Sequence, residues 1–547
     1  MTKLPTSNRL NILGFQAGAH SCGVAYIRGN ELVTVIEEER LTRVKGWKDL
    51  ESNFCRFPLE SLTTLVEKHD LKFEEIDYFT SFLTYEECVP IFLDFNFDLP
   101  LDKYIKIDHH LAHCTASYYL SGFQDETMIF CADASGGNNY NSKTYLGFAG
   151  EMKYVDGITN KRRSLGHFYS ALTELLGYKR LKDEGKIVGL SGHGDIWWEI
   201  YHRWKTILKI EDTQTTIDNH NIEHGRTYTD LHNHFFDEIG SKYWKTDKNI
   251  ADLAFTGQVI FEEAVLELIN NIHKRIPQTK KLALSGGIFA NVKLNKRINE
   301  LDWVEELFVL PPMGDEGLAL GCAIATLKKF NSLFYPFKME NMYLGTEYDY
   351  SDILVASNNT KRNSVVDPYY IAKLLTEKKI LGLYQGSSEH GARALGNRSI
   401  ICEATNEETY AILNGKLHRN DFMPFAPAVL DEDVDEIFNV PKSKYTAEFM
   451  TLLVDTKEAY RDKIPTVVHP VDKTARIQIV TEKSNPLFYE ILKAYKSLTG
   501  IGILVNTSFN VHNEPIVERP IEAFNHLRFG IIDALITPHG IFTSDYR

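Results

Sequence analysis

Cysteine is scarce in this sequence and follows no pairing pattern. The 547 residues include 7 cysteines, and none of them stands in a Cys-x-x-Cys pair. An odd number of scattered thiols is atypical of the disulfide frameworks of secreted proteins, and a zinc ribbon needs paired cysteines. The sequence therefore indicates a reducing compartment and argues against both a disulfide scaffold and a cysteine-based zinc module.

Long apolar runs and an excess of positive charge are missing as well. No stretch approaches the roughly 18–20 apolar residues of a membrane span, and the N-terminal sequence lacks the apolar core of a signal peptide. The 60 Lys and Arg against 74 Asp and Glu give a net charge of −14, which argues against nonspecific binding to nucleic acid or anionic membrane. We expect a cytoplasmic enzyme with no membrane association.

What is present is an ordinary globular composition, with 43% hydrophobic and 24% charged residues. Since domains usually hold about 100–200 residues, the length predicts roughly three structural units. Residues 251–276 predict a long amphipathic helix. Residues 196–250, rich in Trp and His, interrupt the pattern, and we interpret them as an insertion. Periodicity is lost over about 330–362, where we place a domain boundary.

A strand, a glycine-rich loop and a hairpin occur twice in the first half of the chain. Residues 11–15 precede a hairpin over 23–40, and residues 127–137 precede a hairpin over 144–157. The alternation of apolar and polar residues predicts the strands. Such a duplication is typical of the actin-like ATPase and sugar-kinase superfamily, although many α/β proteins share parts of it.

Two histidines stand four residues apart in the sequence HHLAH (109–113). On a helix, His109 and His113 lie on one face and can reach one metal ion. Zinc proteases place a Glu directly after the first His, and this chain has a third His there instead. Asp133 in a DASGG loop and Asp315 in a PMGDEG loop would complete a site suited to Fe(II), Mn or Zn. The alternative is a surface histidine cluster, with each Asp capping a turn.

Five motifs in order resemble the NodU/CmcH family of O-carbamoyltransferases. They are HHLAH, DASGG, EGKIVGLSGHGD, SGGIFANV and PPMGDEGLALG. The family includes nodulation-factor, cephalosporin and tobramycin carbamoyltransferases, and the resemblance runs from Gly14 to about Val517. It implies an α/β fold in which an actin-like, duplicated N-terminal domain, similar to the enzyme that transfers threonylcarbamoyl to tRNA, precedes a YrdC-like α/β domain.

The resemblance also implies a division of the chain. Residues 1–340 would form the metal-binding transfer domain, built from two RNase H-like halves with the insertion at about 196–250. A linker over 341–362 would lead to a YrdC-like, carbamoyl-adenylate-forming domain over 363–547. Of the metals, we expect Fe²⁺, with Mn or Zn as alternatives.

Residue roles in the N-terminal half follow from the same resemblance. His109, His113, Asp133 and Asp315 match the family's metal ligands. His20, in the AGAHSCG loop, would be the general base that takes the proton of the acceptor hydroxyl, and a loop histidine bonded to backbone is the alternative. Lys186 would contact phosphate or acceptor, unless it is an exposed lysine at a helix start. The nucleotide side would comprise Gly136, Gly137, Gly286, Gly287 and Asn291.

The last third of the chain carries cationic and amide side chains beside small residues in loops. Carbamoyl phosphate and ATP are polyanions, so a site for them needs such donors. Solvated surface charge is the alternative. The candidate residues are Arg393, Asn397, Arg398, Lys416, Arg419, His469, Arg476, Asn506, Ser508 and Asn510.

The chain departs from the family pattern near this predicted anion site. Ala392 replaces the proline of a GPRALG motif, and Met423 replaces an arginine before the PFAP segment. The family's Lys-x-Arg-Glu element becomes Leu417-His418-Arg419-Asn420, with Lys416 one position away. These changes bear on the donor and on adenylate formation, whereas the metal ligands are intact.

Taken together, the resemblance implies an ATP-dependent O-carbamoyltransferase. Carbamoyl phosphate and ATP, the latter with Mg²⁺, would yield carbamoyl-AMP, and the carbamoyl group would pass to a hydroxyl of a small molecule or nucleoside. One alternative is modification of a hydroxymethylated base or a tRNA nucleoside. Another is a degraded, nucleotide-binding regulator. A homodimer is a further expectation.

Overall fold

The computed structural model describes residues 2–4, 9–18, 21–29, 31–45, 57–134, 136, 140–159, 164–217, 247–419, 423–440 and 442–544. The chain divides into two compact units. The first comprises Met1–Ile107, Glu316–Phe334 and Met339–Arg547, and the second comprises Asp108–Asp315 and Tyr335–Lys338.

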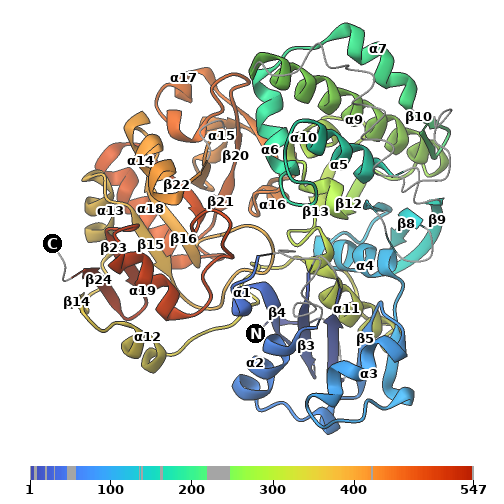
Figure 1. Cartoon of the computed structure of the whole chain (residues 1–547), viewed down its shortest axis with the longest axis horizontal. Coiled ribbons are helices and arrows are strands. Elements are labelled where there is room, and N and C mark those ends of the chain that lie inside the picture. Colours follow the sequence, from blue (N-terminus) through green and yellow to red (C-terminus); the bar gives the residue numbers. More distant parts are fainter. Residues whose placement is uncertain are drawn as a thin grey trace. The chain divides into compact units, whose positions relative to one another are not determined.

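Two sheets, one with β3, β4 and β5 and the other with β8, β9, β12 and β13 labelled in Figure 1, share one strand order. In the first unit it is β4-β3-β2-β5-β6, with β1 beside β4, and in the second it is β9-β8-β7-β12-β13. Each sheet pairs three antiparallel strands with two parallel ones. The bounds are Thr2–Lys3 (β1), Ile12–Gln16 (β2), Gly23–Arg28 (β3), Glu31–Glu37 (β4), Tyr78–Ser81 (β5), Tyr104–Lys106 (β6), Thr127–Ala132 (β7), Tyr140–Phe148 (β8), Glu151–Thr159 (β9), Lys281–Ser285 (β12) and Glu306–Val309 (β13). The duplicated α/β architecture predicted from the sequence is confirmed.

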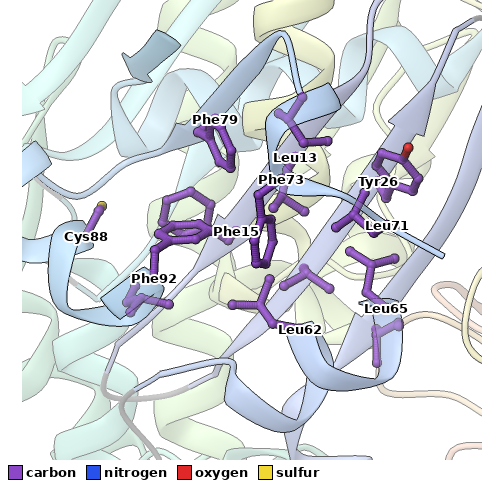
Figure 2. Close-up of a cluster of buried hydrophobic side chains, with 14 of the residues drawn as sticks. Leu13, Phe15, Tyr26, Leu62, Leu65, Leu71, Phe73, Phe79, Cys88 and Phe92 are labelled. Carbon is purple, nitrogen blue, oxygen red and sulfur yellow. The ribbon is translucent and has the colours of Figure 1, made fainter. Parts of the chain in front are cut away.

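Aromatic side chains fill the core beside the first sheet (Figure 2). The ring of Phe92 meets Phe15 and Phe79 edge to face, each at a centroid distance of 5.2 Å. Such contacts add to the free energy of burying the rings. Helix α11 (Leu318–Phe330) contacts β2, and a Cβ on Gly14 would lie 2.3 Å from the carbonyl oxygen of Ala319. Glycine and alanine are therefore what allow the helix to approach the strand this closely.

A third sheet occupies the C-terminal part of the first unit. Its order is β14-β24-β23-β15-β16-β22-β17-β21, and α13 and α18 pack together over its core. The strands are Thr360–Asn363 (β14), Leu381–Tyr384 (β15), Arg398–Glu403 (β16), Ala426–Leu430 (β17), Gln478–Val480 (β21), Ile503–Ser508 (β22), Ala534–Thr537 (β23) and Gly540–Ser544 (β24). A smaller sheet joins Phe438–Asn439 (β18), Leu453–Thr456 (β19) and Thr474–Arg476 (β20).

Helices surround these sheets. In the N-terminal half they are Glu38–Thr42 (α1), Leu59–His69 (α2), Tyr85–Leu93 (α3), His109–Ser121 (α4), Leu165–Leu175 (α5), Glu184–Leu190 (α6), Trp198–Ile207 (α7), Asp247–Arg275 (α9) and Val292–Asn299 (α10). Later ones include Tyr350–Ala356 (α12), Pro368–Thr376 (α13), Glu407–Leu417 (α14), Val434–Ile437 (α15), Lys444–Ala447 (α16), Glu458–Arg461 (α17), Pro486–Thr499 (α18) and Pro520–Arg528 (α19). In the described part of the chain, no helix has the length and apolar character needed to cross a membrane.

Three sequence expectations can be placed on this fold. The long helix predicted over 251–276 is α9, which begins a turn earlier. The interpreted insertion contains α7 and a hairpin of Leu208–Glu211 (β10) with Gln214–Ile217 (β11), and its residues 218–246 lie outside the described ones. The predicted linker, 341–362, contains α12 and most of β14, and β14 pairs with β24. The domain bounds stay a prediction.

Candidate metal centre and anion site

Helix α4 presents two histidines on one face. The helix begins where Asp108 accepts a hydrogen bond from the N–H of Leu111 at 3.0 Å, and it ends at Gly122, whose φ is 75°. His109 and His113 are four residues apart, so both imidazoles project from the same side. Both are buried, at 7% and 0% exposure.

The ends of two strands supply two carboxylates. Asp133 directly follows β7, and Asp315 ends the loop that follows β13. Both strands run parallel to β12, which lies between them, so they end at the same edge of the sheet. Nε2 of His113 lies 3.3 Å from Asp133 Oδ2 and 3.4 Å from Asp315 Oδ1. For Nε2 of His109 these distances are 3.6 and 3.7 Å, so the structure brings the four predicted ligands together.

These separations fit a shared cation. The ligand atoms all lie within 4.8 Å of one another. An ion about 2.0–2.2 Å from nitrogen and oxygen ligands spaces adjacent ligand atoms by about 3.0–3.6 Å. Nε2 of His113 is buried and has no hydrogen-bond partner among the described residues, which leaves its lone pair for a metal. Two imidazoles and two carboxylates suit Fe(II), Mn(II) or Zn(II).

The charges of the group are set by burial and by mutual contact. Burial opposes ionisation of Asp133, but His113 and His109 outweigh it and lower the pKa of this carboxyl well below its usual range. The same two histidines overcome burial and lower the pKa of Asp315. Burial acts to lower the pKa of His109, and its contacts with the two carboxylates raise it. Both carboxylates are therefore ionised near neutral pH, as metal binding requires.

The loop after β12 holds both carboxylate-bearing loops. The backbone N–H of Gly287 donates a hydrogen bond to Oδ1 of Asp133. The N–H of Gly286 donates to the carbonyl of Met313 at 2.7 Å. Gly286 has a φ of 98°, and a Cβ there would lie 2.2 Å from the carbonyl oxygen of Ala132. The position therefore requires glycine, and the two predicted glycines hold the metal centre's loops in place.

A third histidine of α4 packs behind the centre. His110 is fully buried, and neither ring nitrogen has a hydrogen-bond partner among the described residues. It forms a second metal-capable group with Cys131 and Asp133, and burial lowers the pKa of His110 to about 4. A Cβ on Gly136 would lie 2.0 Å from its Cε1, so Gly136 lies directly against this ring. The sequence analysis assigned no role to His110. Its position between the predicted ligands His109 and His113 was the feature that could have indicated one.

Other predicted residues of the N-terminal half have partners of their own. Asn291 caps α10, and its side-chain amide donates to Gln258 at 2.9 Å. Lys186 forms an ion pair with Asp183 at 2.9 Å, within α6 and its N-cap. His20 and Gly137 lie outside the described residues.

Three predicted arginines of the first unit lie within electrostatic reach of one another. Burial lowers the pKa of Arg476 well below its usual value, and the positive charges of Arg393 and Arg419 lower it further. Burial also lowers the pKa of Arg393, which Glu316 opposes, and it lowers that of Arg419 to about 10. Nε of Arg393 is buried and has no hydrogen-bond partner in the described part of the chain. A bound polyanion would relieve this repulsion.

Arg419 links the cluster to two further predicted residues. Its guanidinium donates to Oγ of Ser508 at 2.7 Å and to Oδ1 of Asn510 at 3.4 Å. The amide of Asn510 donates to the backbone carbonyl of Glu514 at 2.8 Å. Although the family's Lys-x-Arg-Glu element is altered here, its arginine thus contacts the intact Ser-x-Asn element.

Arg398 has a different environment. Its terminal nitrogens donate to four backbone carbonyl oxygens at 2.8 to 3.2 Å, and its guanidinium lies 4.0 Å from the ring centroid of Tyr384. The amide of Asn397 donates to the carbonyl of Ser387 at 2.8 Å, and that of Asn506 to the carbonyl of Ala394 at 3.1 Å. These three side chains shape the loop that carries Arg393.

Two predicted residues and one unpredicted one complete this region. Nδ1 of His469 accepts a hydrogen bond from the N–H of Asp472 at 3.3 Å, and Lys416 lies in the last turn of α14. Sequence reasoning missed Lys45, whose pKa is lowered by desolvation and then by the positive charges of Arg419 and Arg393. Lys45 follows α1, and no local pattern ties it to residues that come more than three hundred positions later.

Comparison with known proteins shows the family. The model described as Carbamoyltransferase N-terminus matches residues 93–324, and that described as Carbamoyltransferase C-terminus matches residues 372–543. The protein MJ1058 of Methanocaldococcus jannaschii is 33% identical over 78% of this chain and 72% of its own length. The chain belongs to the carbamoyltransferase family. The expectation drawn from the five motifs is confirmed, and the protein is a carbamoyltransferase enzyme.

Further similarities cover most of this carbamoyltransferase. Nodulation protein NolNO of Sinorhizobium fredii is 28% identical over 94% of the chain and 78% of its own length. Among solved structures, full-length HypF in its phosphate- and nucleotide-bound form is 14% identical, with a TM-score of 0.35. That match covers 61% of this chain and 57% of the HypF chain. A structural similarity this weak does not indicate function.

Proposed function

We propose that this carbamoyltransferase is an ATP-dependent O-carbamoyltransferase that works in two steps. The C-terminal domain forms carbamoyl-AMP, and the metal centre transfers the carbamoyl group to an acceptor hydroxyl. The observation that carries the proposal is the convergence of His109, His113, Asp133 and Asp315, with nitrogen–oxygen separations of 3.3 to 3.7 Å. The proposed domains are 1–340 and 363–547, joined over 341–362, in a cytoplasmic protein.

In the first step, the cationic cluster binds the phosphates of both substrates. Water releases phosphate from carbamoyl phosphate, an oxygen of the resulting carbamate attacks the α-phosphorus of ATP, and pyrophosphate leaves. Both substrates are polyanions, so Arg393, Arg419 and Arg476 serve as binding groups, and Lys45 adds a fourth positive charge. Mg²⁺ accompanies the ATP phosphates.

In the second step, the acceptor oxygen attacks the carbamoyl carbon, the bond to AMP breaks and the hydroxyl proton passes to a base. A bound divalent ion, Fe²⁺ or else Mn²⁺ or Zn²⁺, supplies Lewis-acid polarisation of the carbonyl. His109, His113, Asp133 and Asp315 would hold the ion, and the N–H of Gly287 orients Asp133. The family resemblance assigns the base to His20.

The proposed function can be tested by following both products. The purified protein, loaded anaerobically with Fe²⁺, is incubated with ATP, Mg²⁺ and carbamoyl phosphate, and pyrophosphate is measured. The same mixture is then offered aminoglycosides, nucleosides and hydroxymethylated DNA, and mass spectrometry looks for the mass of one added carbamoyl group. Absence of pyrophosphate release that depends on carbamoyl phosphate would overturn the first step.

The division of labour is tested by His20→Ala. If His20 acts only on the acceptor hydroxyl, the variant releases pyrophosphate at the wild-type rate and loses transfer by about 100-fold or more. Lys186→Ala is measured in the same two assays, because Lys186 forms an ion pair with Asp183. Loss of pyrophosphate release in His20→Ala would contradict the separation of the two steps.

A further inference from the structure

The end of β4 and helix α1 hold a loop of the C-terminal part of the first unit. Oε1 of Glu37 accepts hydrogen bonds from the backbone N–H of Gly391 at 2.6 Å and from Nδ1 of His390 at 2.9 Å. Nη2 of Arg40 donates to the carbonyl of the same Gly391 at 2.8 Å. Both backbone polar groups of one residue are therefore bonded by side chains from a segment about 350 positions earlier in the chain.

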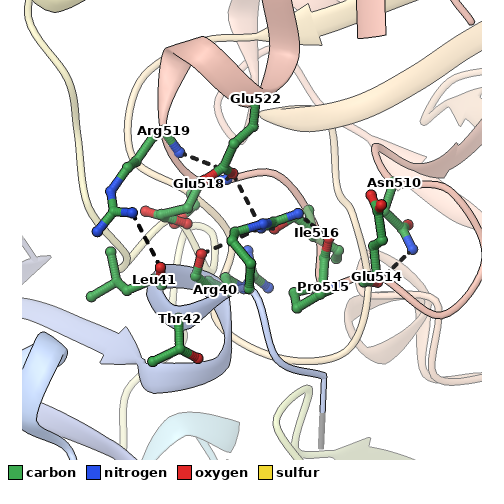
Figure 3. Close-up of polar contacts among 12 residues, drawn as sticks. Arg40, Leu41, Thr42, Asn510, Glu514, Pro515, Ile516, Glu518, Arg519 and Glu522 are labelled. Carbon is green, nitrogen blue, oxygen red and sulfur yellow. Dashed lines mark hydrogen bonds and ion pairs between the residues drawn. The ribbon is translucent and has the colours of Figure 1, made fainter. Parts of the chain in front are cut away.

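A second loop is held by the next arginine. The guanidinium of Arg43 donates to the carbonyls of Pro515 and Ile516, each at 2.7 Å. In the opposite direction, Arg519 donates to the carbonyl of Leu41 at 3.2 Å, as Figure 3 shows. We call Glu37, Arg40 and Arg43 the α1 clamp.

Each loop that the clamp holds carries part of the anion site. Gly391 stands two residues before Arg393, and its φ of 112° belongs to the region that favours glycine. Pro515 and Ile516 follow Glu514, whose carbonyl accepts the amide hydrogen bond of Asn510. The clamp thus fixes the backbone beside one member of the cationic cluster and beside one residue that contacts Arg419.

We propose that Glu37, Arg40 and Arg43 are positioning residues for the phosphate-binding site of the adenylate-forming step. This inference rests on the proposed function of that site. The residues touch neither substrate nor reacting atoms. They set the position of Arg393 and of the Ser508–Asn510 segment, so the N-terminal sheet determines how well the C-terminal domain binds its polyanions.

The electrostatics of the clamp suit this role. Glu37 and Arg40 form an ion pair at 3.2 Å, and both side chains are buried, at 11% and 4% exposure. A charged acceptor strengthens the hydrogen bonds from Gly391 and His390 relative to a neutral one. Because burial excludes competing water, these bonds constrain the loop more than the same contacts would on the surface.

The test compares Glu37→Ala and Glu37→Gln with Glu38→Gln. Glu38 is a matched control, since it is the next residue along the chain and is also buried, but it bonds to the N–H groups of Glu60 and Ser61 on α2. Glutamine retains an oxygen acceptor for Gly391 and loses the charge. We expect the KM for carbamoyl phosphate in pyrophosphate release to rise about tenfold in Glu37→Ala and less in Glu37→Gln, with kcat nearly unchanged. Glu38→Gln should leave KM at the wild-type value.

Hydrogen exchange provides a readout that is independent of activity. In Glu37→Ala, the amides of residues 386–400 should exchange faster than in the wild type, whereas Glu38→Gln should accelerate exchange only near Glu60 and Ser61. Faster exchange over 386–400 with an unchanged KM would overturn the positioning role. So would an equal rise in KM in Glu38→Gln, since that result reports general destabilisation.

The arginines give a second, conservative comparison. Arg43→Lys keeps the positive charge but cannot donate to two carbonyls from one planar group, so we expect faster exchange over 511–518 and a moderate rise in KM. Wild-type protein that releases no pyrophosphate would refute the proposed function. In that case, the hydrogen-exchange pattern of Glu37→Ala would by itself decide whether the α1 clamp holds its loop.

Discussion

The candidate metal centre and the cationic cluster differ in their electrostatics: opposite charges meet in the first, and like charges meet in the second. At the candidate metal centre, two carboxylates face two imidazoles: the histidines lower the pKa of Asp133 and Asp315, and the carboxylates raise that of His109. In the cationic cluster, like charges face one another, and burial together with the other arginines lowers the pKa of Arg476. Opposite charges attract one another at this centre, whereas the cluster is held together by the fold against its own repulsion.

Arg398 and Arg476 show the difference within one unit. The terminal nitrogens of Arg398 donate to four backbone carbonyls, so these bonds stabilise the fold. Arg476 stands among other cations, so its positive charge opposes folding until an anion binds. A buried arginine is therefore informative about ligand binding only after its partners are known.

The largest effect is expected at the metal centre. His113→Ala removes one of the four proposed ligands, and we expect affinity for Fe²⁺ to fall by more than about 100-fold, because loss of a group that merely supports a ligand costs 10–100-fold. Metal content after anaerobic loading and desalting measures this. Carbamoyl-phosphate-dependent pyrophosphate release should persist. His202→Ala, on the exposed side of α7, serves as the control. Full metal content in His113→Ala would show that the four side chains do not share an ion.

The next largest effect tests whether Arg476 and Arg398 affect the stability of the protein in opposite directions. Arg476→Met should raise or leave unchanged the melting temperature without ligand, because it removes repulsion. We expect millimolar pyrophosphate to stabilise the wild-type protein and Arg476→Met to abolish this stabilisation. Arg398→Met should instead lower the melting temperature by several degrees, since four carbonyls lose their donor. Thermal unfolding with and without pyrophosphate distinguishes the two, and equal behaviour of both variants would contradict the comparison.

A smaller effect is expected from the glycines that hold the metal centre. Gly286→Ala places a Cβ against the carbonyl of Ala132 in a backbone region with φ of 98°, so the loop must shift and metal affinity should fall about tenfold. In Gly287→Ala the new Cβ would lie 3.4 Å from Asp133 Oδ1 and the N–H donor is kept. This second variant should bind metal nearly as well as the wild type. Similar losses in both would mean that backbone strain is not the cause.

The smallest effect concerns acid stability. Although burial opposes ionisation of Glu37, Arg40 and the hydrogen bonds from His390 and Gly391 lower its pKa from 4.5 to about 2. A carboxyl with a lowered pKa in the folded state stabilises the protein above its unfolded pKa, and this contribution is lost as the pH falls from about 4.5 to about 2. The free energy of unfolding of the wild type therefore decreases across that window. We expect this decrease to be smaller in Glu37→Gln, by up to about 3 kcal/mol. Urea unfolding at several pH values measures it, and an unchanged pH dependence would refute the assigned pKa.

Much of the metal centre could be predicted from the sequence. The spacing of His109 and His113 is a helical signal, and Asp133 and Asp315 each follow a recognisable apolar strand. The supporting contacts were less visible. The bond from Gly287 to Asp133 and the packing of Gly136 against His110 depend on how loops from different strands meet, which no local pattern records.

The anion site was predictable by residue type but not by partner. Sequence reasoning grouped Arg398 with Arg393, Arg419 and Arg476, since all stand beside small or polar residues in loops or at strand ends. The structure gives Arg398 backbone partners and adds Lys45 from the N-terminal segment to the electrostatic surroundings of Arg393 and Arg419. Side-chain direction and long-range contacts decide between these roles.

The amino-acid sequence by itself determined the family, the repeated pattern of strand, glycine-rich loop and hairpin, and the four candidate metal ligands, because periodicity and short motifs are local properties of the chain. The tertiary structure alone decided which buried charges are neutralised and which are left facing like charges, and it alone joined Glu37 and Arg40 to Gly391. The physical reason is that Coulomb and hydrogen-bond energies depend on distance and burial, and these are fixed only when remote segments pack together.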